Sequence, residues 1–337
     1  MVLELLGQTT AGDHVIFLIS GGASALCTKP LIPLTDWQAL SKALLASGCT
    51  IQEFNTVRKQ LDQIKGGGLG QLASPAKIVT LILSDVLGNP VDMIGSGPTV
   101  PNPQSPADAL DVLTHYHIDQ PHVIQTLQDL TDTDPMFKSP VTIVGDLQLA
   151  TEATQRKGAE IGLQTKIIRL DVTGEAEAIG KEVAQLATQI RPRECWILDS
   201  ATTVTLKGNG LGGRNQEIAL SAALHMPTDS NCLIATYATD GDDGPTSAAG
   251  AIVTSQTLHL AHAKGLDAAA YLDNNDSYTF FNQLDDHLIV TGQTATNVND
   301  LIFVLRPLSN PANTPLIKTI TRRPFSGRLF ILLPKQK

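Results

Sequence analysis

Residues 15–26 read VIFLISGGASAL, an apolar run of strand length that ends in paired glycines. A short run that is apolar on both faces is typical of a central strand in a sheet covered on both sides. Glycines directly after such a strand let the backbone turn tightly and approach another group closely. This stretch therefore predicts a strand, a tight loop and a following helix, which is the repeating unit of an α/β fold.

The same alternation continues along the chain. Other apolar runs of strand length lie at residues 78–83, 141–144, 166–170, 195–198, 232–237 and 288–290. Stretches with helical spacing of apolar residues lie at residues 36–47, 56–71, 107–115, 149–161, 175–189 and 215–224. Strands that alternate with helices predict α/β layers built on largely parallel sheets.

Proline and glycine punctuation predicts two lobes. The polar stretch before residue 141 contains Pro121, Pro135 and Pro140. We therefore expect a first domain at residues 1–120, a linker at 121–140 and a second domain at 141–305. Residues 306–337 contain seven Lys or Arg and no acid, so this basic tail carries +7 and the rest of the chain −9 − 7 = −16. Such a tail binds the acidic body, binds an anionic partner or stays a solvated extension.

Composition argues against several classes of function. The 337 residues are 42% hydrophobic, which is ample for large cores, and the net charge is −9. An acidic surface repels a phosphate backbone, so we expect no nucleic-acid partner. No apolar run approaches the roughly 20 residues that span a bilayer, and the N-terminus lacks a basic signal region. Four cysteines without CxxC spacing indicate reduced thiols, and these features together predict a cytoplasmic protein without membrane contact.

The loop after the first strand is a candidate anion site. Ser20, Gly21, Gly22 and Ser24 offer backbone N–H groups and two hydroxyls, and a helix that starts here would add its positive end. The Gly-Lys-Ser/Thr ending of a nucleotide-binding P-loop is absent. An ordinary strand-to-helix turn explains the same residues equally well.

Asp85 follows another apolar strand and precedes a glycine-rich loop at residues 95–97. Ligands of open α/β sheets bind at the carboxyl ends of the strands. Asp85 is therefore a candidate ligand of Mg²⁺ or of a substrate hydroxyl. A helix cap or an Asx turn is the alternative interpretation.

Three cations, Arg58, Lys59 and Lys65, lead into the glycines at residues 66–68. If a helix begins near Thr56, Arg58 and Lys65 lie seven residues apart on one stripe. Arginine grips a carboxylate or phosphate with two parallel hydrogen bonds, and lysine acts as a mobile point charge. An anion-holding helix and a solvent-exposed basic face both remain open.

Residues 208–217, GNGLGGRNQE, form the strongest candidate site. Four glycines in six residues lead directly into a helical stretch that starts near Arg214. A fixed cation beside the positive end of a helix suits a phosphoryl group in transfer, whose charge must be neutralised. A glycine hairpin with a surface arginine is the alternative. The residues predicted to bind the cofactor here are Gly212, Gly213, Asn215 and Glu217.

Two further polar segments follow. Asp240, Asp242 and Asp243 come directly after a strand, and carboxylates so close together suit Mg²⁺, with Asp240 as the preferred ligand. A polar turn without an ion is the alternative. The loops at residues 274–278 and 291–300 are rich in amides and hydroxyls that could close over a small polyhydroxy acid or serve as ordinary loop caps. In the second loop we expect Thr294 and Asn297 to contact the cofactor.

Together these segments resemble the glycerate 2-kinase family, whose C-terminal part is called the MOFRL domain. The matching stretches occur in family order: LISGGASAL, NTVRKQLDQIKGG, LILSDVLGNPVDMIGSGPTVPNP, TTVTLKGNGLGGRNQEIAL, ATDGDDGPTSAAGAIV, NNDSY and TGQTATNVNDL. The resemblance implies two Rossmann-like α/β lobes with the site in the cleft between them. It also implies ATP-dependent phosphoryl transfer to the 2-hydroxyl of D-glycerate, with Mg²⁺, giving 2-phosphoglycerate.

The resemblance also suggests roles for single residues. Arg214 matches the family's proposed catalytic arginine. Arg58 and Lys65 are expected to hold the substrate carboxylate or the phosphates. Asp85 and Asp240 are expected to bind Mg²⁺ or a hydroxyl.

The chain departs from the family pattern in places. Family members carry a further segment before LISGGASAL, with a proposed catalytic lysine, so the chain is interpreted as N-terminally truncated. The family's Gly-Gly-Glu is here Asp199-Ser200-Ala201. Two alternatives stay open: a hydroxypyruvate reductase using NAD(P)H, against which the missing dinucleotide fingerprint argues, and a non-catalytic remnant. A homodimer is also left open.

Overall fold

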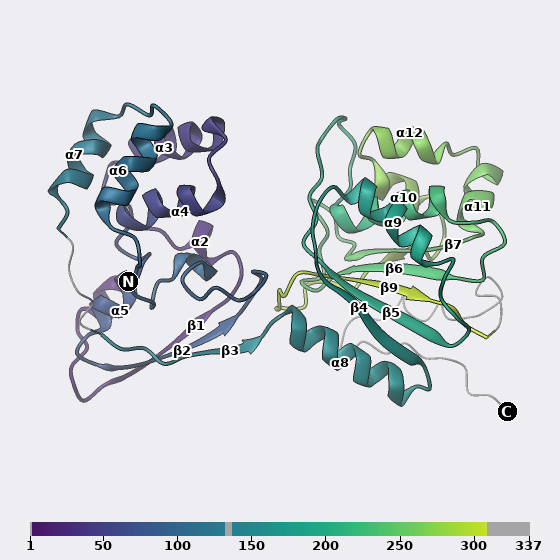
Figure 1. Cartoon of the computed structure of the whole chain (residues 1–337), viewed down its shortest axis with the longest axis horizontal. Helices are drawn as coiled ribbons and strands as arrows, with labels where there is room; N and C mark the ends of the chain where they lie inside the picture. Colours follow the sequence, from purple (N-terminus) through teal and green to yellow (C-terminus); the bar gives the residue numbers. More distant parts are fainter. Residues whose placement is uncertain (1, 132–136, 309–337) are drawn as a thin grey trace. The chain divides into compact units, whose positions relative to one another are not determined.

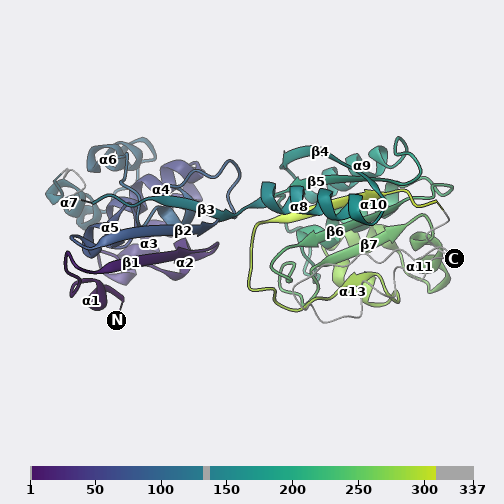
Figure 2. The same cartoon turned by 90° about the horizontal axis from the view of Figure 1, so that it is seen from below.

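The computed structural model describes residues 2–131 and 137–308, so most of the predicted basic tail lies outside the described residues. The chain divides into two compact units, Met1–Gly145 and Asp146–Lys337 (Figures 1 and 2). Each unit combines one sheet with helices, which confirms the predicted α/β class. In the described part of the chain, no helix is both long and apolar enough to cross a membrane.

The first unit is built on a three-stranded parallel sheet. Its strands are β1 (His14–Ile19), β2 (Lys77–Leu83) and β3 (Val141–Gly145), in that spatial order. Ile19 pairs with Ile82, so β1 and β2 end side by side. Because parallel strands end at one edge of a sheet, the loops at residues 20–24 and 84–86 emerge together.

Helices gather on one side of this sheet, and Figure 2, seen from below, shows the strands in front of them. Their apolar faces form a core around Trp37, Leu40 and Val57. Reciprocal capping boxes, Thr50 with Glu53 and Ser105 with Asp108, start two of the helices. The helices are α1 (Val2–Leu6), α2 (Ala23–Leu26), α3 (Leu34–Ser47), α4 (Ile51–Gln60), α5 (Gly68–Ala73), the 3-10 turn η1 (Ile94–Ser96), α6 (Pro106–His115) and α7 (Pro121–Asp129).

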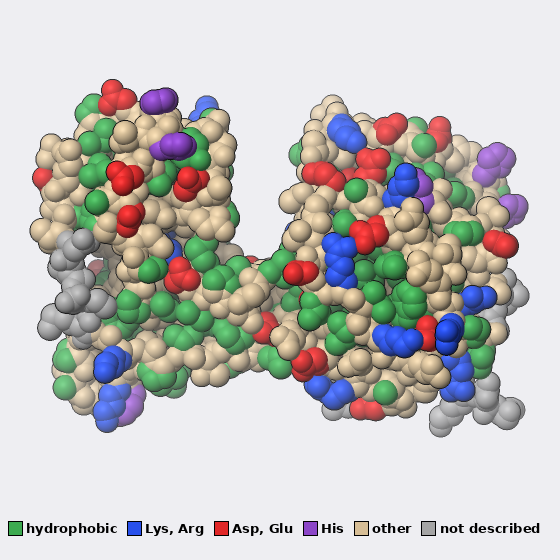
Figure 3. Space-filling view, in the orientation of Figure 1, with side chains coloured by type: hydrophobic (Ala, Val, Ile, Leu, Met, Phe, Trp, Pro, Cys, Tyr) green, Lys and Arg blue, Asp and Glu red, His purple; other side chains and the backbone are tan. Residues whose placement is uncertain are grey.

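The other face of the sheet keeps apolar side chains in solvent. Ile16 and Leu18 on β1 are 64% and 78% exposed, and Val79 and Val144 on the neighbouring strands are also exposed. Residues two apart on a strand share a face, so these side chains form one patch. Figure 3 shows hydrophobic side chains gathered in the region of this sheet.

Two predicted boundaries were wrong. Helix α7 lies in the predicted linker, and its Val123 and Leu127 are buried in the core of the first unit. Pro121 stands in the first turn of this helix, where a missing N–H costs nothing. Strand β3, assigned to the second domain from sequence, pairs with β2, because an apolar strand does not reveal which sheet it joins.

The second unit is built on a six-stranded sheet in the order β4-β5-β9-β6-β7-β8. Only β4 and β5 are parallel; the other neighbours are antiparallel, so the prediction of largely parallel sheets holds in the first unit and was wrong here. Strands β7 and β9 were not predicted from the sequence. The strands are β4 (Gln164–Val172), β5 (Glu194–Ser200), β6 (Leu233–Ala238), β7 (Gly250–Thr254), β8 (Leu288–Ile289) and β9 (Asp300–Leu305).

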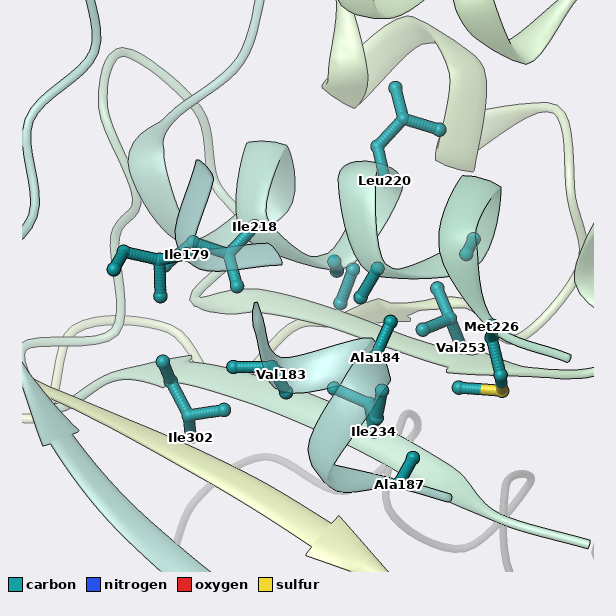
Figure 4. Close-up of a cluster of buried hydrophobic side chains, with 14 of the residues drawn as sticks. Ile179, Val183, Ala184, Ala187, Ile218, Leu220, Met226, Ile234, Val253 and Ile302 are labelled. Carbon is teal, nitrogen blue, oxygen red and sulfur yellow. The ribbon is translucent and has the colours of Figure 1, made fainter. Parts of the chain in front are cut away.

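Helices cover both faces of this sheet, with α8 on the face opposite α9 and α10 (Figure 1). The core under α9 and α10 contains Ile179, Val183, Ile218, Ile234 and Ile302 (Figure 4). This packing fixes α10 over the sheet, with its first residue near the edge where β5 and β6 end. The helices are α8 (Leu147–Glu160), α9 (Ala176–Leu186), α10 (Arg214–His225), α11 (Thr257–Ala263), α12 (Ala268–Asp273) and α13 (Ser277–Asn282).

Candidate functional site

Arg214 and Asp300 form a two-point ion pair at the sheet edge of the second unit. Asp300 opens β9 between the ends of β5 and β6, where it pairs with Ser200 and Ala238. Arg214 Nε donates to Asp300 Oδ2, and Nη2 donates to Oδ1 at 3.1 Å. The Asp300 side chain is 1% exposed and that of Arg214 39% exposed. The guanidinium therefore rests on a buried carboxylate and keeps an open side.

Charge at this edge is dominated by carboxylates. Burial raises the pKa of Asp300, and the hydrogen bonds from Arg214 oppose that rise. Burial lowers the pKa of Arg214, but Asp300, Asp243 and Asp240 outweigh it, so the net pKa is raised. Arg214 is thus a permanent cation with three acidic neighbours.

Asp243 caps helix α10, a role that the sequence did not predict. Its Oδ1 accepts from the Asn215 N–H at 3.1 Å, and its Oδ2 accepts from the Gln216 N–H at 2.8 Å. Burial raises the pKa of Asp243 to about 6, against the lowering effect of these backbone hydrogen bonds. The Asp243 carboxylate therefore binds the N–H groups of Asn215 and Gln216 at the helix start, where a cofactor phosphate was predicted.

The glycines at residues 208–213 serve close packing against residues 274–278. A Cβ on Gly210 would lie 2.6 Å from the Asn274 carbonyl oxygen and would collide with Asp276. The Leu211 N–H donates to Asp276 Oδ1 at 2.8 Å, and the Leu211 carbonyl accepts from Tyr278. Residues 208–213 and 274–278, which were predicted as separate sites, therefore pack together as one unit.

The side chain of Glu217 is turned into this packing. It is 5% exposed, and its Oε2 accepts from Asn275 Nδ2 at 3.0 Å. Asn275 in turn accepts from the backbone N–H groups of Lys207 and Gly208. Glu217 therefore braces the glycine loop through Asn275.

A small set of donors at the start of α10 stays open. Within residues 2–131 and 137–308, the backbone N–H groups of Gly212, Gly213 and Arg214 donate to no protein acceptor. Ser277 is 1% exposed, and its hydroxyl has no partner among the described residues and stands against Gly212. Because Gly213 is extended, with φ −145° and ψ 174°, the N–H groups on its two sides point in different directions, so these N–H groups and the guanidinium are separate donors for an anion at the start of α10.

The loop at residues 291–299 is tied to the end of β6. The Thr294 hydroxyl donates to the Thr239 carbonyl at 2.6 Å, and its N–H donates to the Asp240 carbonyl at 3.0 Å. Asn297 accepts from the Asn299 N–H within the loop. These bonds bring Thr294 to Asp240, the half-buried carboxylate predicted to bind metal.

In the first unit, the loop at residues 20–24 meets Asp85. The Asp85 carboxylate accepts from the N–H of Gly22, and burial raises the pKa of Asp85. Gly22 has a φ of +80°, which only glycine adopts readily, and Gly21 precedes it. The Ser24 hydroxyl bonds the Ser96 hydroxyl at 2.7 Å, while Ser20 is exposed. Asp85 therefore helps to hold the loop at residues 20–24 through its hydrogen bond with Gly22.

Lys65 is buried beneath this loop. Its ammonium donates to the carbonyls of Ser24 at 2.7 Å and Cys27 at 2.9 Å, and lies 3.9 Å from Asp62. Burial lowers the pKa of Lys65, and Asp62 partly offsets that effect. These contacts assign Lys65 to holding the loop rather than to an open binding surface.

Arg58 is held by aromatic rings. Its guanidinium carbon lies 4.9 Å from the ring centre of Trp37 and 5.0 Å from that of Phe54. Its buried Nε has no hydrogen-bond partner among the described residues, and no ion pair joins it to an acid there. Burial lowers the pKa of Arg58, with Asp62 opposing. A guanidinium held in this way retains its capacity to grip an anion.

Comparison with known proteins places this chain. Residues 1–128 match the family model described as "Domain of unknown function (DUF4147)", and residues 194–300 match the MOFRL family. The D-glycerate 2-kinase of Thermotoga maritima is 40% identical over 315 residues, covering 90% of this chain and 75% of the relative. The human glycerate kinase is 37% identical, covering 91% of this chain and 70% of its own. The chain belongs to the glycerate kinase family.

A solved member supports the same assignment. The crystal structure of the Thermotoga maritima glycerate kinase matches with a TM-score of 0.83, covering 90% of this chain and 76% of the other. Within this glycerate kinase family chain, the predicted residues fall into two groups, one in each unit. Their meeting in a shared cleft stays a prediction. In the described ranges, no group of three or more His, Cys, Asp or Glu is arranged to hold a metal ion.

Proposed function

We propose that this chain is a glycerate 2-kinase, which transfers the γ-phosphoryl group of ATP to the 2-hydroxyl of D-glycerate and forms 2-phosphoglycerate. The observation that carries the proposal is the Arg214 guanidinium, fixed by Asp300 next to three open backbone N–H groups. Donors preorganised around a developing negative charge are the main means by which proteins catalyse phosphoryl transfer.

The phosphates of ATP are assigned to the start of α10. The N–H groups of Gly212, Gly213 and Arg214 would hold phosphate oxygens, and the guanidinium would face the group in transfer. Because Asp243 already accepts from the next two N–H groups, the bound anion stays at the mouth of the helix. Asn215, which was predicted to bind the cofactor, remains a candidate for this site because its side chain donates to Asp243.

Glycerate is assigned to the first unit. Its carboxylate suits Arg58, whose guanidinium is desolvated and forms no ion pair with an acid in the described residues, although the nearby Asp62 partly offsets the lowering of its pKa by burial. Ser20, Ser24 and the N–H of Gly21 would hydrogen-bond the hydroxyls, since the N–H of Gly22 already donates to Asp85. Exclusion of water from the reacting phosphoryl group would spare ATP from hydrolysis.

A divalent cation fits the chemistry of the second unit. Asp240, Asp243 and Asp300 outnumber Arg214 there, so an incoming polyphosphate meets excess negative charge. Mg²⁺ is usually held by one or two carboxylates together with substrate phosphates, so a cage of three protein ligands is not required. Asp240 is the ligand we favour in the second unit, and Asp85 is a separate candidate ligand in the first unit. Mg²⁺, when bound, would neutralise phosphate charge.

The test is a product analysis on the purified chain. Protein is incubated with D-glycerate and MgATP, and ³¹P NMR distinguishes 2-phosphoglycerate from 3-phosphoglycerate. We expect 2-phosphoglycerate from the wild-type chain and a loss of at least about 100-fold in R214A. Folded protein that forms neither product would overturn the activity but not the family assignment.

A parallel assay addresses the reductase alternative. The same preparation is mixed with hydroxypyruvate and NADH or NADPH, and the nicotinamide absorbance is followed. We expect no consumption, and steady oxidation would favour the reductase. A cytoplasmic location and a homodimer stay predictions, which fractionation and light scattering test.

A further inference from the structure

Asp300 is placed by the sheet itself, whereas Asp240 and Asp243 follow the end of β6. It lies on β9, in the interior of the sheet, with Ser200 of β5 and Ala238 of β6 as its cross-strand neighbours. Its two oxygens meet two different nitrogens of Arg214. A guanidinium gripped at two points is held in orientation as well as in position.

Charge alone does not explain this contact. Asp300, Asp243 and Asp240 all reduce the positive potential at Arg214, so a buried Asp300 opposes the binding of a phosphate. A carboxylate that is 1% exposed also carries a desolvation cost, which its pairing with Arg214 offsets. The benefit that remains is geometric.

We propose that Asp300 is a positioning residue for phosphoryl transfer: it orients Arg214 so that the remaining guanidinium N–H groups face the anion held by residues 212–214. This inference rests on the proposed function and adds a residue to it. Arginine has five N–H donors, and Asp300 takes two of them. The other three are then directed toward the open side, which a freely rotating side chain would not ensure.

A double-mutant cycle tests the proposal in the full-length chain. The variants are R214A, D300N, their combination and the control D285N, which removes a surface ion pair with Lys264. We measure kcat and KM for both substrates, and the binding of tripolyphosphate by calorimetry. D300N should lower kcat about 10- to 100-fold with KM for glycerate changed less than about threefold, as for other residues that orient a reacting group. In the R214A background D300N should add less than about threefold.

Chemical rescue separates positioning from a structural role. Free guanidinium should restore activity to R214A but not to R214A/D300N, because only Asp300 would hold the added cation in place. If D300N unfolds, D300E keeps the charge and moves it by one methylene; it should lose kcat while retaining most of its stability.

Tripolyphosphate binding gives a readout that needs no turnover. Positioning predicts weaker binding to D300N than to wild type, whereas simple charge neutralisation predicts tighter binding. Tighter binding with unchanged kcat, or equal fold losses from D300N with and without Arg214, would overturn the proposal. Absence of turnover in the wild type would overturn the proposed function instead, and the binding cycle would still decide the role of Asp300.

Discussion

Asp243 and Gln216 are joined at two points: Oδ2 of the aspartate accepts from the Gln216 N–H at 2.8 Å and from Gln216 Nε2 at 3.0 Å. The side chain of Gln216 also donates to the Thr246 hydroxyl at 2.9 Å. The turn after β6 and the first turn of α10 are thereby one hydrogen-bonded body. These hydrogen bonds fix the first turn of α10, from which the Arg214 side chain projects.

Removal of the Asp243 carboxylate should destabilise the second unit. D243A deletes a buried helix cap and leaves the N–H groups of Asn215 and Gln216 without their acceptor. We expect the free energy of unfolding to fall by about 2–4 kcal/mol, from cap loss and unsatisfied donors together. Urea denaturation followed by circular dichroism measures it. An effect no larger than that of D285N would show that the cap is dispensable.

The same residue should give the chain a stability that depends on pH. Burial raises the pKa of Asp243 to about 6 in the folded state, from the ordinary aspartate value of 3.8. The folded chain therefore holds this proton more tightly, and the contribution is full below about pH 4 and is lost as pH rises through 6. Relative to D243N, which cannot titrate, wild type should gain roughly 1–3 kcal/mol between pH 7 and pH 4. Parallel unfolding curves that differ by a constant at all pH values would contradict this.

Gly210 should tolerate no side chain. The added methyl of G210A would meet Asn274 and Asp276 and separate the glycine loop from residues 274–278. Overpacking of this kind should lower the unfolding free energy by about 1–3 kcal/mol. The matched control is G12A, since a Cβ there meets nothing closer than 3.8 Å. Thermal denaturation of both variants provides the comparison, and equal melting temperatures would rule out the close approach.

At position 58, the planar guanidinium of arginine should matter more for binding glycerate than positive charge alone. R58K keeps a cation near Trp37 and Phe54 but loses the planar two-point grip on a carboxylate. We expect KM for D-glycerate to rise at least about tenfold, with KM for ATP little changed. K42M, at an exposed lysine of α3, serves as the control. A rise confined to ATP would move the glycerate carboxylate away from Arg58.

Local patterns predicted much of the fold, and pairing partners account for the errors. The run at residues 15–26 gave its strand and loop correctly because both depend on neighbouring residues. Strand β3 was placed in the wrong unit, since its partner β2 lies about 60 residues away in the sequence. Strand β9, which carries Asp300, was missed although DLIFVL is an apolar run of strand length.

The candidate site was predicted in its residue types more than in their roles. Glycines 208–213 attracted attention as a phosphate loop, and their packing on residues 274–278 could not be foreseen because it joins distant segments. Asp243 was grouped with Asp240 because the two are close in sequence, yet its side chain binds the N–H groups at the start of α10. The isolation of Arg58 between Trp37 and Phe54 likewise needed the tertiary structure.

The exposed apolar patch of Ile16, Leu18, Val79 and Val144 has a consequence for handling the protein in solution. Sheets that present such side chains to water attract one another, so concentrated samples of this chain should cluster, more so on warming. Loss of activity in such a preparation is then explained by association of the molecules and does not require a defect in catalysis. Turnover measurements belong on dilute, freshly filtered protein whose particle size has been checked first.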